Sequence, residues 1–142
     1  MLDKNNIEIC KEWKEEEVSI VRDGIISYNM NLNPSYPRVE PVNLILKDDK
    51  GKVIGGLLGK IYLLGLFIDI LWIDNNYRNL GYGYRLLSEI EEIGRAKGCK
   101  FIHLDTFSFQ APDFYKKCGF KVFGILDSYP EGISRYYLKK DI

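Results

Sequence analysis

The chain of 142 residues has the length of one domain, and its 46% apolar and 28% charged residues are typical of a globular protein rather than a disordered one. Twenty basic and twenty acidic side chains cancel, so the broad positive field by which proteins bind nucleic-acid phosphates is missing, and we expect no nucleic-acid partner. The longest apolar stretch, residues 61–73, is too short to span a membrane and contains Asp69, so no membrane partner is expected either.

The first predicted element is an amphipathic helix at residues 15–30. Its apolar residues recur every three to four positions, which is the spacing of one helix face. We expect this face to be part of the core, and its residues are Val18, Val21, Ile25 and Tyr28. The Asn-Pro-Ser-Tyr-Pro segment at residues 33–37 ends the helix in an exposed loop, because proline lacks a backbone donor and restricts the residue before it.

Two strands are predicted at residues 42–47 and 52–62, joined as a hairpin by the turn-forming residues 48–51. Residues 66–73 read Leu-Phe-Ile-Asp-Ile-Leu-Trp-Ile and are apolar on both sides of a strand. This pattern is typical of a central strand that is covered on each face, so we expect helices on both faces of the sheet.

The second half of the sequence continues to alternate between helix-like and strand-like segments. A helix is predicted at residues 81–97, where one apolar stripe faces the core and Gly98 follows the helix end. The stripe consists of Leu86, Leu87, Ile90 and Ile93. The later predicted elements are a strand at 101–106, a short helix at 112–118, and a second hairpin of strands at 121–126 and 134–139. This order predicts a mixed α/β (α+β) fold with a central twisted sheet, in one domain over residues 1–142.

The Arg-Asn-Leu-Gly-Tyr-Gly segment at residues 78–83 lies between the predicted central strand and the following helix. Glycines let backbone N–H groups approach a phosphate closely, and a helix start adds unpaired donors and the positive end of the helix dipole. Arg78 adds a full charge, so the segment suits a diphosphate. Neither a P-loop nor a dinucleotide fingerprint fits, because no Gly-Lys-Ser/Thr follows and the third glycine position is Leu86. The alternative is that the glycines only turn the chain into the helix.

Two motifs in the right order favour the diphosphate site over a purely structural turn. A strand that ends Leu-Trp-Ile at residues 71–73, followed by Arg-x-x-Gly-x-Gly, resembles the acetyl-CoA motif of the GNAT superfamily of N-acetyltransferases. Residues 111–120 resemble the second signature of that superfamily, a short helix that carries a tyrosine and ends at Gly-Phe. The segment LDTFSFQAP at residues 104–112 resembles a bacterial subgroup of small members, and the resemblance as a whole covers roughly residues 42–139.

This resemblance implies a GNAT-like sheet flanked by helices on both faces, and an enzyme that transfers the acetyl group of acetyl-CoA by direct attack. The implied acceptor is a primary amine of a small molecule, with a protein amine the less expected case. The residues implied to bind coenzyme A are Leu71, Trp72, Ile73, Arg78, Asn79, Leu80, Gly81, Tyr82, Gly83, Tyr84, Ser108, Ala111 and Tyr115. Many members carry Asn where Ser108 stands, so the contact of this shorter side chain with the pantetheine arm is in question.

Two residues are candidates for catalysis. By its motif position, Tyr115 is implied to be the general acid that meets the sulfur of departing coenzyme A, although helical spacing alone favours a packing tyrosine. Asp69 stands out without any family, because a carboxylate inside an apolar strand is costly to bury unpaired. Alternation places it on the face of Leu71 and Ile73, where it is either a base or anchor for the amine, or a structural group bound to backbone or to a tyrosine hydroxyl. His103 stands within a strand of packing residues and is predicted to be structural.

Loops around such a scaffold often determine specificity. We expect the acceptor site to involve residues 33–41, with Tyr36 and Arg38, and residues 127–132, with Tyr129 and Glu131. Aromatic and acidic groups in these loops suit a small cationic amine, although solvated turns have the same composition.

Cys10, Cys99 and Cys118 are odd in number and lack metal-ligand spacing, so we expect no disulfide framework, no metal, and a cytoplasmic location. Two other functions stay open: a coenzyme A-binding sensor or partner subunit without catalysis, and an interaction domain without a cofactor. The sequence leaves open the acceptor, the length of the acyl chain and the oligomeric state, with a homodimer as one option.

Overall fold

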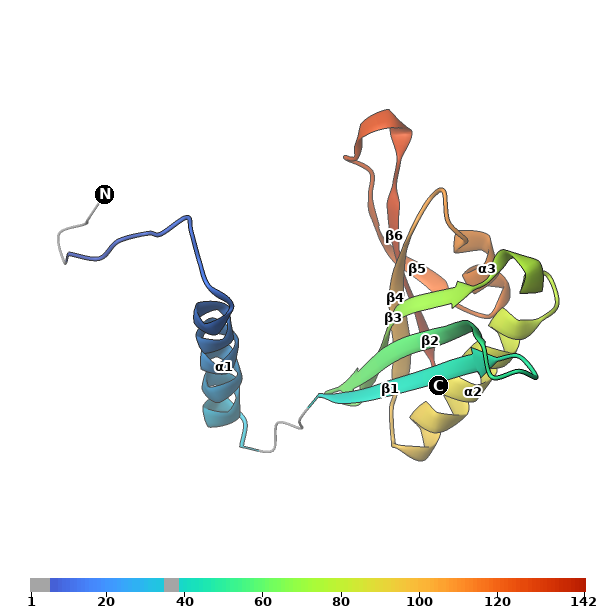
Figure 1. Cartoon of the computed structure of the whole chain (residues 1–142), viewed down its shortest axis with the longest axis horizontal. Helices are drawn as coiled ribbons and strands as arrows, with labels where there is room; N and C mark the ends of the chain where they lie inside the picture. The colour runs from blue at the N-terminus through green and yellow to red at the C-terminus, as the bar shows by residue number, and fades with distance from the viewer. Residues whose placement is uncertain (1–5, 35–38) are drawn as a thin grey trace. The chain divides into compact units, whose positions relative to one another are not determined.

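The structure, a computed structural model, describes residues 6–34 and 39–142 of the chain. The chain divides into two compact units, Met1–Tyr36 and Pro37–Ile142, and Figure 1 labels the helices and strands of each. The residues Tyr36 and Arg38, which we predicted for an acceptor loop, lie outside the described residues.

The first unit contains α1 (Glu15–Leu32), which confirms the predicted helix. The backbone N–H of Lys14 donates to Glu17 Oε2 at 2.7 Å and closes the helix start. Acidic residues fill the first turn, where they interact favourably with the helix dipole. No described residue of α1 is buried, so this unit does not itself form the core that we predicted for the apolar face of the helix.

The second unit is built on a six-stranded sheet in the order β1-β2-β3-β4-β6-β5 (Figure 1). The strands are β1 (Glu40–Lys47), β2 (Val53–Tyr62), β3 (Gly65–Ile73), β4 (Phe101–Phe107), β5 (Lys121–Leu126) and β6 (Arg135–Asp141). Neighbouring strands are antiparallel except β3 and β4, which are parallel, so the sheet is mixed as predicted. Both predicted hairpins, β1 with β2 and β5 with β6, are confirmed.

Two α-helices complete the second unit. α2 (Tyr82–Ala96) connects β3 to β4, and α3 (Pro112–Lys117) connects β4 to β5. The short 3-10 helices η1 (Asn75–Tyr77) and η2 (Pro130–Gly132) precede α2 and β6. Gly98 and Gly119 follow the two helices with φ of 81° and 93°, the left-handed conformation that helix ends favour and that glycine adopts without strain.

The core of the second unit lies between α2 and the sheet. The predicted apolar stripe of α2 is confirmed, since Leu86, Leu87 and Ile90 are buried and Ile93 packs against them. On the other face of β3, Ile70 and Trp72 are 50% and 49% exposed. In the described part of this unit, α2 therefore packs on one face of β3. The unit does not itself place the second helix layer that we predicted on the other face.

Two irregularities of β3 create the site: its pairing with β4 ends early, and its register with β2 shifts while the two strands stay paired. The parallel pairing of β3 with β4 ends at Ile68 and Leu104. On the other side of β3 the register shifts, because Leu58 faces Ile70 while Gly59 faces Ile68, which leaves Asp69 as the extra residue of a β-bulge. A wedge-shaped gap therefore opens between the C-terminal halves of two adjacent parallel strands.

Candidate active site

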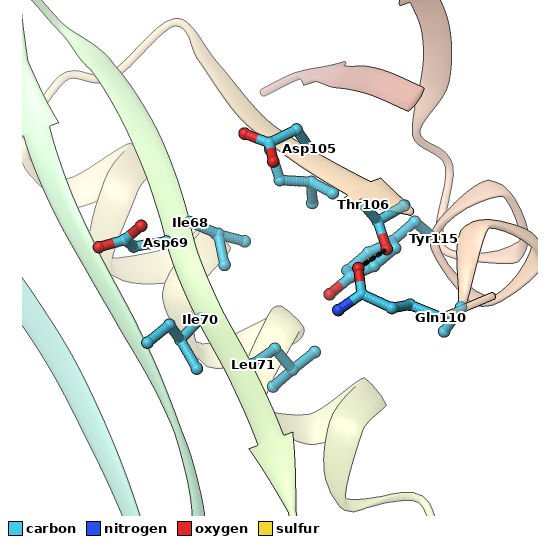
Figure 2. Close-up of a pocket in the computed structure, with 10 residues that line it drawn as sticks. Ile68, Asp69, Ile70, Leu71, Asp105, Thr106, Gln110 and Tyr115 are labelled. Atoms are coloured by element: carbon cyan, nitrogen blue, oxygen red, sulfur yellow. Dashed lines mark hydrogen bonds between the residues drawn. The ribbon is translucent and has the colours of Figure 1, made fainter. Parts of the chain in front are cut away.

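The gap between β3 and β4 holds a pocket of about 190 Å³, named here the wedge pocket (Figure 2). It is lined by Ile68, Asp69, Ile70 and Leu71 of β3, Leu104, Asp105 and Thr106 of β4, and Gln110, Ala111 and Tyr115. Buried apolar side chains close its inner end, and polar groups come from β4, α3 and the turn between them. Such a combination suits a small reacting group that must be oriented and shielded from water.

A second pocket of about 540 Å³, named here the turn pocket, lies at the glycine turn. It is lined by Leu71, Ile73, Tyr77, Arg78, Asn79, Gly81, Tyr82, Gly83, Tyr84, Ala111 and Phe114. Leu71 and Ala111 line both pockets, so the two pockets meet there. Together they accommodate a long ligand with one end at the turn and the other beside Tyr115.

The backbone of the turn suits an anion. Asn79 and Gly81 have φ of 59° and 84°, and Gly81 is the residue that caps α2. A Cβ atom on Gly81 would meet no described atom within 4 Å, whereas one on Gly83 would lie 3.1 Å from Phe114 Cζ. Gly81 is thus required for its conformation, and Gly83 lets α2 pack closely against α3. The unpaired N–H groups of the first helical turn and the helix dipole favour a bound phosphate.

Arg78 has a second function that its motif position did not predict. Its Nε donates to the carbonyl oxygen of Ile73 at 2.8 Å and ties the turn to the end of β3. Arg78 is also one of the residues that line the turn pocket. Arg78, which we predicted to place a positive charge beside the phosphates, is therefore bonded to the end of β3, the strand that borders the turn pocket.

Tyr115, the residue that we predicted to be the general acid, lies in α3 and is buried. The residue is 8% exposed and packs edge-on against Phe114 and Phe120, with ring centroids 5.3 Å and 5.8 Å away. Its hydroxyl faces the wedge pocket in Figure 2. Burial, together with the nearby Cys118, raises the pKa of Tyr115 to about 12, so the hydroxyl remains protonated at neutral pH.

Asp69 lines the wedge pocket, but two structural expectations for it are wrong. It is exposed rather than buried, and its side chain does not lie on the face of Leu71. In Figure 2 Asp69 and Ile70 lie on one side of β3, while Ile68 and Leu71 lie on the other. The β-bulge is the cause, because the extra residue puts two consecutive side chains on one side and shifts the alternation that follows.

Asp105 and Arg135 form a pair that the sequence did not reveal. Arg135 Nη2 and Nε lie 2.6 Å and 2.9 Å from Asp105 Oδ1. The guanidinium also lies 5.5 Å from the ring centroids of both Phe107 and Tyr137. Hydrogen bonds with Tyr129 and with Asp105 raise the pKa of Arg135. The pair joins β4 to β6 at Asp105, which lines the wedge pocket. Tyr129, a predicted acceptor-loop residue, lines neither pocket and packs edge-on against Phe107, with ring centroids 5.3 Å apart.

Three predicted coenzyme A contacts have side chains that line neither pocket: Trp72, Leu80 and Ser108. Trp72 lies on the face of β3 that does not pack on α2, and Leu80 is 63% exposed. Ser108 instead bonds to the start of β6, because its Oγ accepts from the N–H of Ser134 at 3.1 Å and its own N–H donates to Ser134 O at 2.8 Å.

Some site residues were missed by sequence reasoning, namely Tyr77 and Phe114 of the turn pocket and Asp105, Thr106 and Gln110 of the wedge pocket. Phe114 directly precedes Tyr115 in the second motif, and this position is a signal from which its place at the site could have been inferred. His103 packs against Phe67 and Phe101, with ring centroids 4.9 Å and 5.5 Å away, as a structural histidine would. Burial lowers the pKa of His103, although Asp105 opposes this effect.

The described residues contain no group of three or more His, Cys, Asp or Glu side chains placed to hold a metal ion. The three cysteines are all free thiols. Within residues 6–34 and 39–142, no helix combines the length and the apolar character needed to cross a membrane.

Comparison with known proteins gives a consistent result. Residues 8–120 match the acetyltransferase (GNAT) family. A blasticidin-S acetyltransferase of Streptomyces morookaense is 35% identical over 95 residues, which are 66% of this chain and 70% of that protein. An acetyltransferase of Agrobacterium fabrum is 29% identical over 126 residues, covering 88% of this chain and 90% of that one. The crystal structure of an acetyltransferase from Bacillus cereus superposes with a TM-score of 0.85 at 39% identity, covering 95% of this chain and 98% of that chain.

Proposed function

The chain belongs to the acetyltransferase (GNAT) family and uses acyl-CoA, and we propose that it acetylates a primary amine of a small molecule by direct attack. The observation that supports this most is the meeting of the two pockets at Leu71 and Ala111. It puts an anion-binding helix start and a buried, protonated hydroxyl at the two ends of one continuous site.

The residues around both pockets fit acetyl-CoA, which supplies an activated acyl group. Backbone N–H groups at Gly81, Tyr82 and Gly83, with the charge of Arg78, would hold the diphosphate. Main-chain groups of Leu71 to Ile73 would hydrogen-bond the pantetheine arm, since this part of β3 has lost its pairing with β4. Trp72 would contribute through its backbone only.

In the proposed reaction the amine nitrogen bonds to the acyl carbon, and the bond from that carbon to sulfur breaks. A lysine-like amine with a pKa of about 10.4 is mostly protonated at neutral pH, so the ammonium first loses one proton to Asp69, directly or through water. The nitrogen loses a second proton to water as the amide forms. The sulfur accepts a hydrogen bond from the hydroxyl of Tyr115 as negative charge develops on it, and the departing thiolate takes its proton from water. No covalent enzyme intermediate is required.

Two observations support a cationic small-molecule acceptor. The exposed carboxylate of Asp69 lies on the side of β3 away from Tyr115 and Gln110, so it can meet an amine that enters from solvent (Figure 2). One relative is named as an acetyltransferase of blasticidin S rather than of a protein. The family match over residues 8–120 spans both compact units and supports one acetyltransferase domain over residues 1–142; that domain assignment and a cytoplasmic location remain predictions.

The test is a screen of small amines with acetyl-CoA, read by release of free thiol. We expect at least one amine to release thiol. We expect Asp69→Asn to lower kcat and to raise KM for that amine, because the variant lacks the proposed base and its charge, and to leave the affinity for acetyl-CoA unchanged. Binding of acetyl-CoA without thiol release across the whole panel would refute small-molecule acetylation.

A further inference from the structure

Gln110 is a polar residue of the wedge pocket that no motif assigned. It lies in the turn between β4 and α3, and its side chain extends toward β3 (Figure 2). Ser108, the residue that the family resemblance implied for a polar contact with the co-substrate, is bonded to Ser134 instead. The turn therefore presents a carboxamide to the pocket from a position two residues further along the chain.

The orientation of this carboxamide is fixed by its neighbours. The backbone N–H of Phe107 lies 2.8 Å from Gln110 Oε1, and a backbone N–H can only donate, so the atom that faces it must be the oxygen. The hydroxyl of Thr106, which is 5% exposed, lies 3.1 Å from the same oxygen. The N–H of Gln110 also donates to Phe107 O at 2.9 Å and closes the turn.

Because its oxygen is held in this way, the NH₂ group of Gln110 must face the opposite direction. Figure 2 shows it directed into the wedge pocket, which Tyr115 also lines. Within the described residues, Gln110 Nε2 has no hydrogen-bond acceptor. A donor has thus been oriented by the fold toward the space in which the proposed reaction takes place.

We propose that Gln110 is a further catalytic residue, whose NH₂ group donates a hydrogen bond to the carbonyl oxygen of the thioester. This inference rests on the proposed function. Gln110 lines the wedge pocket and not the turn pocket, so it lies beyond the junction at Leu71 and Ala111, on the side of Tyr115. The carbonyl oxygen gains negative charge as nitrogen bonds to carbon and loses it as the carbon–sulfur bond breaks, and no proton leaves Gln110. A donor held in place beforehand stabilises that charge without reorganisation.

The decisive variant is Gln110→Glu. One carboxylate oxygen can still accept from Phe107 N–H and from Thr106, so the turn is kept, while the other oxygen replaces the donor that faces the pocket. Loss of one such donor typically lowers kcat by about 10²-fold to 10³-fold, and we expect a loss of this size. By calorimetry, we expect weaker binding of acetyl-CoA and unchanged binding of coenzyme A, which has no acyl carbonyl.

Gln110→Met, which has a similar length and no polar group, is the second variant, and the melting temperature of each variant reports on its fold. The proposal is overturned if either folded variant keeps wild-type kcat, or if coenzyme A and acetyl-CoA lose affinity equally, since the contact would then be to the pantetheine arm. An active wild type with an equally active variant refutes this inference alone. A wild type that releases no thiol refutes the proposed function and this inference with it.

Discussion

The hydroxyl of Tyr115 is kept protonated by the side chains that bury it, since burial raises its pKa to about 12. A coenzyme A thiol has a pKa of about 8.5, so complete proton transfer from Tyr115 to the thiolate is uphill by about 5 kcal/mol. We therefore expect Tyr115 to assist mainly by donating a hydrogen bond to the sulfur as negative charge develops there.

Tyr115→Phe removes that donor and keeps the ring packing against Phe114 and Phe120. We expect kcat to fall by about 10²-fold, the lower end of the range for acid–base groups, with the affinity for acetyl-CoA unchanged. Steady-state kinetics and calorimetry check the two parts. Because the pKa is about 12, ionisation of Tyr115 should not reduce wild-type activity at neutral or mildly alkaline pH. If Tyr115→Phe kept the wild-type kcat, Tyr115 would have a packing role only, and its hydroxyl would not take part in catalysis.

The raised pKa of Tyr115 also predicts how stability depends on pH. The folded state holds this proton more tightly than the unfolded state, in which the pKa has its ordinary value of about 10. The corresponding contribution to the free energy of unfolding is complete below about pH 10 and is lost as the pH rises toward about 12. Denaturant unfolding of wild type and Tyr115→Phe across this range tests it, since only the wild type should lose this contribution. Parallel curves for the two proteins would contradict it.

At the level of elements, local sequence pattern was a good guide. The stripe of α2 was read from periodicity, and the ends of α2 and α3 from glycine and proline, because these signals act over a few residues. Asp69 shows where the method fails. Alternation within β3 predicted its face, but the bulge arises from the register with β2, which no pattern inside β3 contains.

The glycine turn and the start of α2 act as one element, and the conformation of Gly81 is central to it. Gly81→Ala forces a left-handed residue and should reduce the free energy of unfolding by about 1–2 kcal/mol. It should also weaken the binding of acetyl-CoA, because relief of the strain moves the N–H groups that hold the diphosphate.

Gly51→Ala is the matched control. Gly51 has φ of 80°, a Cβ there would meet no described atom within 4 Å, and the residue lines neither pocket. Chemical denaturation should give similar losses for both variants, and calorimetry should show weaker binding for Gly81→Ala alone. Equal binding by both variants would show that the turn does not hold the phosphates.

At the level of the whole molecule, the site depends on residues far apart in the sequence. The position of β6 between β4 and β5 places Arg135 opposite Phe107 and beside Asp105. Single-sequence reasoning found the strands but not this order, since pairing depends on which strands meet rather than on the pattern within each. The same limit explains why Tyr115 was identified, from a local motif, while Asp105 was not.

The Asp105–Arg135 pair predicts that binding of the amine at the wedge pocket and binding of acetyl-CoA at the turn pocket can be changed separately. Arg135→Met removes the hydrogen bonds to Asp105 and Tyr129 and releases the loop that carries Tyr129. We expect a lower melting temperature and a higher KM for the amine identified in the screen. The affinity for acetyl-CoA should be unchanged, because the turn pocket has no contact with this pair.

Lys139→Met is a suitable control on the same strand, since Lys139 pairs with Asp141 at 3.5 Å and both side chains are well exposed, at 50% and 79%. Such surface pairs contribute about 0–1 kcal/mol, so this variant should resemble the wild type in melting temperature and kinetics. If Arg135→Met weakened acetyl-CoA binding as much as it raised the KM for the amine, the acceptor side and the coenzyme side would not be separable. If Arg135→Met changed neither acetyl-CoA binding nor the KM for the amine, Arg135 would have a structural role only. The acceptor would then have to be recognised from β3, where Asp69 is an exposed charge of the wedge pocket.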